Sequence, residues 1–264
     1  MEFAFLGSGS KGNCFVLKSK SSLIVIDCGG SKKSIVDGFK SLDLNIENVD
    51  ACLITHLHQD HISQLGLFDE IPIYSSCDIK GYNINIVDSL SSFIINDVEI
   101  MPIELSHDCD RTMGFILSHN SEKLVYITDT GYLNDKYIPY LYGATYIILE
   151  SNHDVEMLMN SNRPQFLKSR IYCDSGHLSN DDCAQVLSKI VTVNTKEIIL
   201  AHLSRDCNSD ELALLTSINK LKNNKELLSS NIIIKVAKQD MIIKGGVTHE
   251  ENLMDSSDSF INLV

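Results

Sequence analysis

Four side chains that can bind metal lie within six consecutive residues: His56, His58, Asp60 and His61. They follow directly on the apolar run 51–54, which is typical of a short buried strand. In an extended chain, residues i and i+2 point the same way, so His56 and His58 can share one ion. If a helix begins near Asp60, then Asp60 and His61 turn through a different angle and can reach a second ion. The cluster therefore predicts a site for two metal ions.

Five further motifs are spread along the chain. They are Phe-Leu-Gly-Ser-Gly-Ser-Lys-Gly-Asn (5–13), Thr-Asp-Thr-Gly-Tyr (128–132), Leu-Glu-Ser-Asn-His-Asp (149–154), Gly-His-Leu-Ser-Asn (176–180) and Leu-Ala-His-Leu-Ser (200–204). Thr-His-x-His-x-Asp-His after a strand resembles the signature of the metallo-β-lactamase superfamily, and the five motifs resemble its WalJ/YycJ/VicX group. That group is similar to the ribonuclease Z and ribonuclease J branches, and its members are regarded as bacterial exonucleases. The resemblance runs from about residue 3 to about residue 240.

The resemblance implies a complete set of ligands for two divalent ions. One ion would be bound by His56, His58 and His107, the second by Asp60, His61 and His202, and Asp129 would bridge them. Because every ligand is an imidazole or a carboxylate, the set suits Zn²⁺ and also admits Mn²⁺. Such a pair would lower the pKa of bound water, and the bridging hydroxide would attack a phosphodiester. Asp60 would be both a ligand and a catalytic residue that orients this hydroxide.

Glu150 and His177 form a second constellation. Glu150 follows an apolar strand-like run, and His177 comes just before Ser179-Asn-Asp-Asp182, a helix-capping pattern. They resemble the acid and histidine motifs of the nuclease branches, in which a carboxylate orients a histidine that binds the scissile phosphate or protonates the leaving oxygen. The alternative is a structural glutamate beside a histidine at the start of a helix.

Candidate phosphate contacts come from three stretches of polar or cationic side chains. They are Ser8, Ser10 and Asn13 in the glycine-rich loop, Ser151 and Asn152 after Glu150, and Arg163, Lys168 and Arg170 in a stretch without acids. The loop is not a Walker A sequence, although glycine-rich backbone can form an anion-binding concavity. A tight turn and a solvated charged face are the structural alternatives.

Composition sets broad limits on the class of protein. The 264 residues are 44% hydrophobic and contain only four prolines, which predicts one domain over residues 1–248. The polar, acidic residues 249–264 are expected to form a flexible tail. No apolar run approaches the roughly 18 residues that span a bilayer, and no signal segment is evident. Eight scattered cysteines without a Cys-x-x-Cys pair are typical of reduced thiols. We therefore expect a cytoplasmic protein without membrane partners.

The strand and helix pattern indicates an α/β or α+β fold, and the resemblance specifies an αββα sandwich of two mixed β-sheets flanked by helices. Residues 151–176 are too few for the cap domain that ribonuclease J carries, so we expect a small lid in its place. The transfer-RNA-gripping arm of ribonuclease Z is also not evident.

Three functions remain open from the sequence. The resemblance favours a dinuclear phosphodiesterase that degrades nucleic acid, DNA rather than RNA, as a 5′-to-3′ exonuclease. The net charge of −13 argues mildly for a small substrate instead, such as a thioester, lactone or β-lactam. The third function is a non-catalytic regulatory protein of a two-component signalling operon, which the complete ligand set disfavours.

Overall fold

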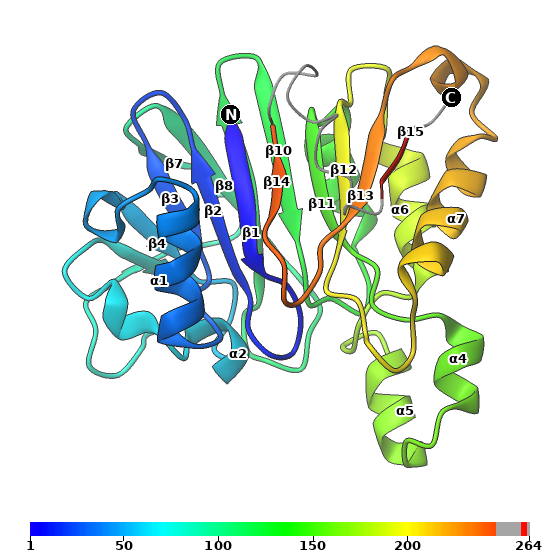
Figure 1. The fold of residues 1–264 in the computed structure, drawn as a ribbon, viewed down its shortest axis with the longest axis horizontal. Coiled ribbons are helices and arrows are strands. Elements are labelled where there is room, and N and C mark those ends of the chain that lie inside the picture. Colours follow the sequence, from blue (N-terminus) through cyan, green and yellow to red (C-terminus); the bar gives the residue numbers. More distant parts are fainter. Residues whose placement is uncertain (247–259, 263–264) are drawn as a thin grey trace. The chain divides into compact units, whose positions relative to one another are not determined.

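The computed structural model describes residues 1–246 and 260–262, and this part of the chain divides into two compact units (Figure 1). One unit consists of residues 1–104, 109–121 and 237–246, and the other of residues 105–108, 122–236 and 260–262. The single domain expected over 1–248 stays a prediction.

The first unit contains a mixed seven-stranded sheet with the order β14-β1-β2-β3-β4-β5-β6. Its strands are β1 (Glu2–Gly7), β2 (Cys14–Lys18), β3 (Leu23–Ile26), β4 (Ala51–Leu53), β5 (Ile73–Ser75), β6 (Ile84–Ile86) and β14 (Ile243–Gly245). Strands β14 to β3 pair antiparallel, and β3 to β6 pair parallel. Every residue of β3 and β4 is buried, as expected for parallel strands covered on both faces.

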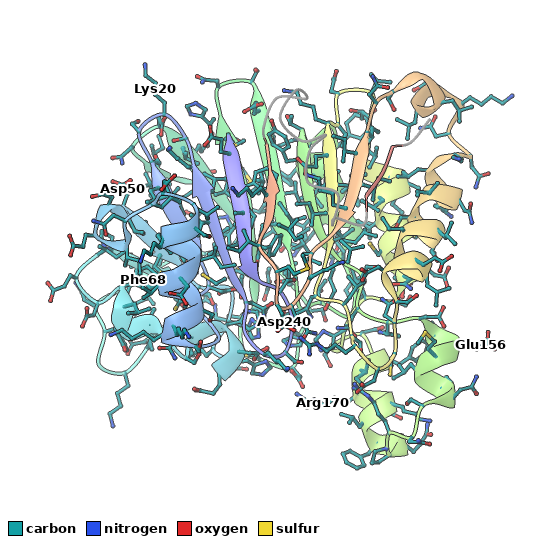
Figure 2. The ribbon with its side chains drawn as sticks, viewed as in Figure 1. Lys20, Asp50, Phe68, Glu156, Arg170 and Asp240 are labelled. Carbon is teal, nitrogen blue, oxygen red and sulfur yellow. The ribbon has the colours of Figure 1, made fainter. Side chains whose placement is uncertain are left out.

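Helix α1 (Lys32–Ser41) is the longest helix of the first unit within the described residues. The side chain of Ser31 caps it by accepting a hydrogen bond from Ser34 N. Phe39 of α1 is buried with Phe68, and their ring centroids lie 6.5 Å apart; Phe68 is labelled in Figure 2. The unit also contains α2 (Gln59–Ile62), the 3-10 helices η1 (Ile46–Asn48) and η2 (Leu65–Leu67), and an antiparallel ladder of β7 (Phe93–Ile95), β8 (Val98–Glu104) and β9 (Met113–His119).

The second unit contains a mixed arrangement of five strands. They are β10 (Glu122–Ile127), β11 (Tyr146–Glu150), β12 (Glu197–Ala201), β13 (Ile233–Val236) and β15 (Phe260–Asn262). Strands β10 to β13 are parallel, in a register that pairs Glu150 with Ala201, and β15 is antiparallel to β13. The remaining residues of the predicted tail 249–264 lie outside the described residues.

The helices of the second unit are α3 (Ile138–Leu141), α4 (Val155–Asn160), α5 (Gln165–Tyr172), α6 (Asn180–Ile190) and α7 (Asp210–Leu221), with the 3-10 helices η3 (Asp135–Tyr137) and η4 (Lys225–Ser229). Ser179 caps α6 by accepting a hydrogen bond from Asp182 N, as the sequence predicts. Segment 151–176 is occupied mainly by α4 and α5. None of the helices within residues 1–246 and 260–262 is long and apolar enough to cross a membrane.

Polar side chains stand at the carboxyl ends of the parallel strands in both units. In the first unit Asp27 follows β3, and His56 follows β4 by three residues. In the second unit Asp129 follows β10, Glu150 ends β11, and His202 follows β12. Asp27, Asp129 and His202 have φ values of 60°, 58° and 59°. Non-glycine residues adopt this left-handed conformation uncommonly, and it is frequent at functional sites, although five other residues of the described chain share it.

Candidate metal centre and its orienting residues

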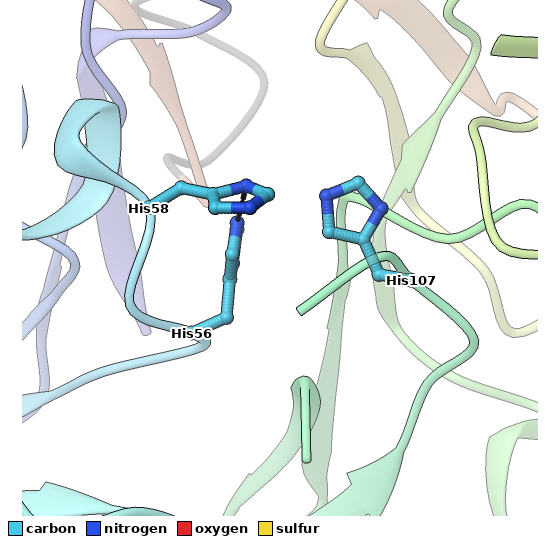
Figure 3. A group of neighbouring side chains, drawn as sticks. All are labelled: His56, His58 and His107. Carbon is cyan, nitrogen blue, oxygen red and sulfur yellow. Dashed lines mark hydrogen bonds between the residues drawn. The ribbon is translucent and has the colours of Figure 1, made fainter. Parts of the chain in front are cut away.

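The loop after β4 carries the four clustered ligand candidates of the first unit. His58 is the N-cap residue of α2, so Asp60 and His61 lie in this helix, whereas His56 and His58 precede it. The helix begins where the sequence predicts. His56 Nε2 and His58 Nδ1 face each other at a distance of 3.0 Å (Figure 3). Two imidazole nitrogens at this separation suit binding of one ion between them.

Asp27 and Thr55, which the sequence analysis does not single out, hold these histidines in place. Asp27 Oδ2 lies 2.8 Å from His61 Nδ1, and the carboxylate also accepts hydrogen bonds from Thr55 N and Thr55 Oγ1. Thr55 Oγ1 lies 3.0 Å from His56 Nδ1. With Nδ1 of His56 and of His61 engaged in this way, Nε2 is the ring nitrogen able to bind a metal ion. Burial raises the pKa of Asp27, and the neighbouring His61 offsets this effect only in part.

A sequence signal for Asp27 was available. Asp27 directly follows the fully apolar run 23–26. Asp129 stands in a similar place, two residues after the strand that ends at 127.

The glycine-rich loop packs against the metal-ligand loop through Asn13. Asn13 Oδ1 accepts a hydrogen bond from Gly9 N, while Asn13 Nδ2 lies 2.8 Å from His61 Nε2 and 3.4 Å from Asp60 Oδ2. Asn13 N also donates to Asp60 O. In the structure Asn13 contacts two predicted metal ligands, and its predicted contact with phosphate stays a prediction. In the same loop Ser8 is buried and Ser10 is exposed.

Asp129 is at the centre of the corresponding group in the second unit. Its Oδ1 atom lies 3.4 Å from His202 Nε2 and 4.0 Å from His107 Nε2. His107 Nδ1 lies 3.0 Å from the carbonyl oxygen of Gly176, which fixes the proton on Nδ1 and leaves Nε2 directed toward Asp129. Burial lowers the pKa of His107, so its imidazole is neutral and able to coordinate a metal at neutral pH.

Glu150 contacts both His177 and His202. Glu150 Oε1 lies 2.8 Å from His177 Nδ1 and 2.8 Å from His202 Nδ1, and Oε2 accepts hydrogen bonds from Thr130 N and Leu178 N. Burial alone would raise the pKa of Glu150, but the two histidines and their hydrogen bonds outweigh it and hold this pKa well below its usual range. The sequence predicts the contact with His177; the contact with His202 emerges only from the structure.

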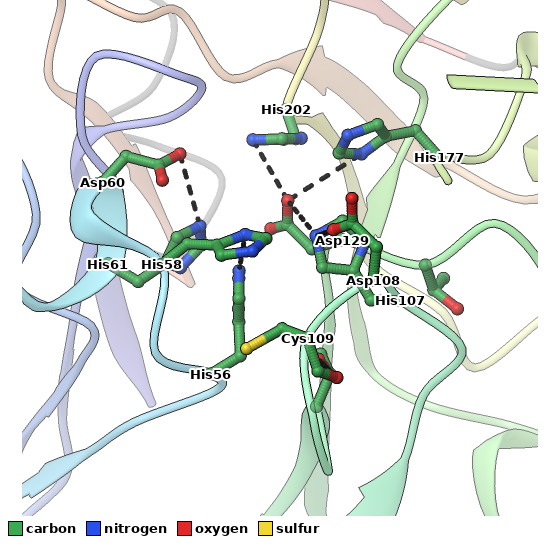
Figure 4. A network of polar contacts seen from close by, with 12 residues as sticks. His56, His58, Asp60, His61, His107, Asp108, Cys109, Asp129, His177 and His202 are labelled. Atoms are coloured by element: carbon green, nitrogen blue, oxygen red, sulfur yellow. Dashed lines mark hydrogen bonds and ion pairs between the residues drawn. The ribbon is translucent and has the colours of Figure 1, made fainter. Parts of the chain in front are cut away.

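The donor atoms of the second unit fit a divalent metal ion. One ligand atom from each of Asp129, Glu150, His177 and His202 lies within 4.8 Å of all the others. Imidazole nitrogen and carboxylate oxygen are the donors that such ions prefer when no thiolate takes part. Because Glu150 already accepts four hydrogen bonds, its carboxylate orients the two histidines, and Asp129 and His202 are the candidate ligands of this group. Figure 4 shows His177, His202 and Asp129 pointing toward one another.

The structure gives the other predicted substrate contacts partners within the protein. Ser151 Oγ donates to Asn180 Oδ1, and Asn152 Nδ2 donates to His202 O. Arg163 Nη2 pairs with Asp206, Lys168 Nζ donates to Met159 O, and Arg170 Nε donates to Asp108 Oδ2. Ser151, Asn152 and Lys168 are also buried. Of these five side chains, that of Arg170 is 59% exposed, and it is therefore the best placed to contact a ligand.

The fold and the site define the class of protein. The beta-lactamase superfamily domain matches residues 23–203, so the chain belongs to this family. A solved metallo-β-lactamase fold protein, YhfI from Bacillus subtilis, is 15% identical, with a TM-score of 0.68 over 92% of this chain and 98% of its own. The predicted metallo-β-lactamase fold, with two mixed sheets flanked by helices, is confirmed.

Two curated relatives share most of their length with this chain. It is 36% identical to exodeoxyribonuclease YycJ of Bacillus anthracis over 82% of this chain and 87% of that protein. It is 32% identical to exodeoxyribonuclease WalJ of Streptococcus pneumoniae over 83% of this chain and 88% of that protein. The resemblance inferred from the five motifs is confirmed.

Proposed function

We propose that the chain is a metal-dependent exodeoxyribonuclease that hydrolyses DNA from an end. The observation that carries this proposal is the hydrogen-bonding arrangement of Glu150, which orients a candidate metal ligand, His202, and a second histidine, His177, with one carboxylate oxygen. A site that only hydrolyses an activated small molecule has less need of the second histidine. The two curated relatives, both named exodeoxyribonucleases, support the choice of DNA.

We also propose the ligand assignment that the sequence predicts. His56, His58 and His107 would bind one ion, Asp60, His61 and His202 a second, and Asp129 would bridge them, with Zn²⁺ or Mn²⁺ as the metal. The Nδ1 contacts of His56, His61, His107 and His202 support this assignment, because each places the proton on Nδ1 and makes Nε2 the nitrogen able to coordinate. When bound, the ions would lower the pKa of water and neutralise phosphate charge.

His177 supplies the chemistry that the metal ligands do not. Its Nδ1–H donates to Glu150, so Nε2 can meet the substrate, and the side chain is 21% exposed. In the imidazolium form, Nε2–H would donate a proton to the leaving sugar oxygen or a hydrogen bond to the scissile phosphate. The carboxylate of Glu150 fixes the orientation of this ring. Asp60, which lies beside His61 in α2, would be both a metal ligand and the residue that orients the attacking hydroxide.

The alternative functions are less well supported. In a small-molecule hydrolase the Glu150–His177 contact would have no catalytic role. In a regulatory protein the set of metal-binding side chains would have no role.

We further propose 5′-to-3′ polarity and a cytoplasmic location. None of the eight cysteines forms a disulfide, which supports a reducing compartment.

The decisive experiment uses purified protein with end-labelled single- and double-stranded DNA and RNA, in the presence of Zn²⁺ or Mn²⁺. We expect mononucleotides to be released progressively from one end of DNA, faster than from RNA. Asp60→Asn, prepared in parallel, should abolish release and so exclude a contaminating nuclease. Absence of DNA cleavage by metal-loaded protein, together with hydrolysis of a thioester or lactone, would refute the proposal.

A further inference from the structure

Helix α5 presents a large aromatic side chain that the rest of the described chain leaves exposed. Phe166 is 75% exposed, the highest value among the large hydrophobic residues of the described chain. Arg170 follows one helical turn later, and its side chain is 59% exposed. Residues four apart lie on the same face of a helix, about 6 Å apart along its axis. An aromatic ring and a guanidinium group therefore stand side by side on α5 (Figure 2 labels Arg170).

This helix is held rigidly, so the exposure of Phe166 does not come from a loose segment. Leu158 of α4 and Ile171 of α5 are buried together with Cys207, and Leu167 packs against them. Lys168 is buried as well and donates a hydrogen bond to Met159 O at the end of α4. A rigid support lowers the entropic cost of binding a ligand on the opposite face of the helix.

Arg170 connects α5 to the candidate metal centre of the second unit. Its Nε donates to Asp108 Oδ2 at 2.5 Å, and Asp108 Oδ1 lies 3.3 Å from His107 Nε2. Asp108 raises the pKa of Arg170, so the guanidinium is fully charged. A guanidinium group carries five N–H donors, and the contact with Asp108 uses the one on Nε. The other four N–H groups, on the two terminal nitrogens, favour binding of an anion with several oxygens, such as a phosphate.

We infer that Phe166 and Arg170 form a subsite for a single-stranded DNA end, with Arg170 binding a backbone phosphate and Phe166 stacking on the adjacent base. This inference rests on the proposed nuclease function and names the part of the substrate that α5 holds. Stacking on an aromatic side chain requires an unpaired base, because the faces of paired bases are covered by their neighbours. A lone aromatic ring beside a charged group matches a nucleotide better than it matches an apolar protein partner.

Fluorescence tests the stacking directly, because the chain contains no tryptophan. Phe166→Trp introduces a single tryptophan, and a short single-stranded oligodeoxynucleotide should quench it saturably in EDTA, where no turnover occurs. Tyr140→Trp is the matched control. Tyr140 is 41% exposed on α3, and its carbonyl oxygen accepts a hydrogen bond from Lys123 near the start of β10, the end opposite Asp129. We expect no quenching there.

Two further variants separate stacking from charge. Phe166→Ala should weaken binding of the single strand about 5- to 150-fold, the usual worth of one stacked base, and should affect a blunt duplex less. Arg170→Gln should reduce the slope of log Kd against log salt concentration by about 0.7, the value for one lost phosphate contact on a single strand. Lys189→Gln, which removes one cation from the exposed pair with Asp135, is the control and should keep the wild-type slope.

The outcomes distinguish the subsite from the proposed function. If the wild-type protein degrades DNA while Phe166→Trp is not quenched and Phe166→Ala binds normally, the subsite is wrong and the nuclease stands. If quenching and the salt slope behave as expected but no metal supports cleavage, the nuclease fails and the nucleic-acid subsite stands. Equal quenching of the Phe166→Trp and Tyr140→Trp variants would mean non-specific binding and would overturn the inference.

Discussion

Glu150→Gln is the substitution that tests the site most sharply, because it keeps the shape of the side chain and changes only one oxygen. Glu150 accepts four hydrogen bonds: two from the backbone N–H groups of Thr130 and Leu178 at Oε2, and two from His177 and His202 at Oε1. The amide nitrogen of glutamine is a donor, so it cannot replace the oxygen that faces the fixed backbone N–H groups. It must therefore face the two histidines.

The histidines can adapt to this amide, and that adaptation should cost metal affinity. If Nδ1 of His177 and His202 becomes an acceptor, each proton moves to Nε2, and the hydrogen bonds to the side chain at position 150 are kept. The free energy of unfolding should then change little. Binding a metal at His202 Nε2 would require the proton to return to Nδ1, where it would face the amide N–H. One or two hydrogen bonds lost in this way, at about 1–1.5 kcal/mol each, correspond to roughly 5- to 150-fold weaker binding.

The assay is a competition titration of metal between the protein and a chelator, combined with NMR assignment of the histidine tautomers. Glu197→Gln is the matched control, since Glu197 is also buried, begins the neighbouring strand β12 and pairs with Lys235. It should lower thermal stability but keep the metal affinity. Unchanged metal affinity and unchanged tautomers in Glu150→Gln would refute the orienting role assigned to Glu150.

Three further substitutions test other parts of the structure. His177→Ala should slow DNA hydrolysis about 10²- to 10⁴-fold with unchanged metal content, and a wild-type rate would remove His177 from the mechanism. Asp27→Asn should weaken metal binding about 10- to 100-fold, because His61 loses its carboxylate partner; chelator competition measures this. Asp97→Asn should cost about 1 kcal/mol of stability at neutral pH. Burial would raise the pKa of Asp97, but hydrogen bonds from two serine hydroxyls outweigh burial and lower it. This stability is therefore present above the unfolded pKa near 3.9 and is lost as the pH falls through the lower folded pKa. Thermal unfolding from pH 7 to pH 2 measures the loss.

The sequence predicts the elements of the site better than their partners. The strand before His56, the start of α2 near Asp60 and the cap at Ser179 all appear where local patterns indicate them. Such features depend on residues within one or two turns, and hydrophobic period and capping chemistry record them locally. The partners of the candidate phosphate contacts could not be predicted in this way. Ser151 and Asn152 are polar residues that the fold buries and hydrogen-bonds within the protein.

The sequence by itself determined which side chains could bind metal, their spacing, and the family to which those motifs belong. Only the tertiary structure decided how these side chains are oriented. Glu150 meets histidines that lie 27 and 52 positions away in the chain, and Asp27 meets His61 from 34 positions away. These meetings follow from the register of parallel strands, which pairs Glu150 with Ala201 and brings strand ends from distant parts of the chain to one edge. Parallel strands are joined by long crossover connections, so each of these contacts joins residues that no short stretch of sequence contains together.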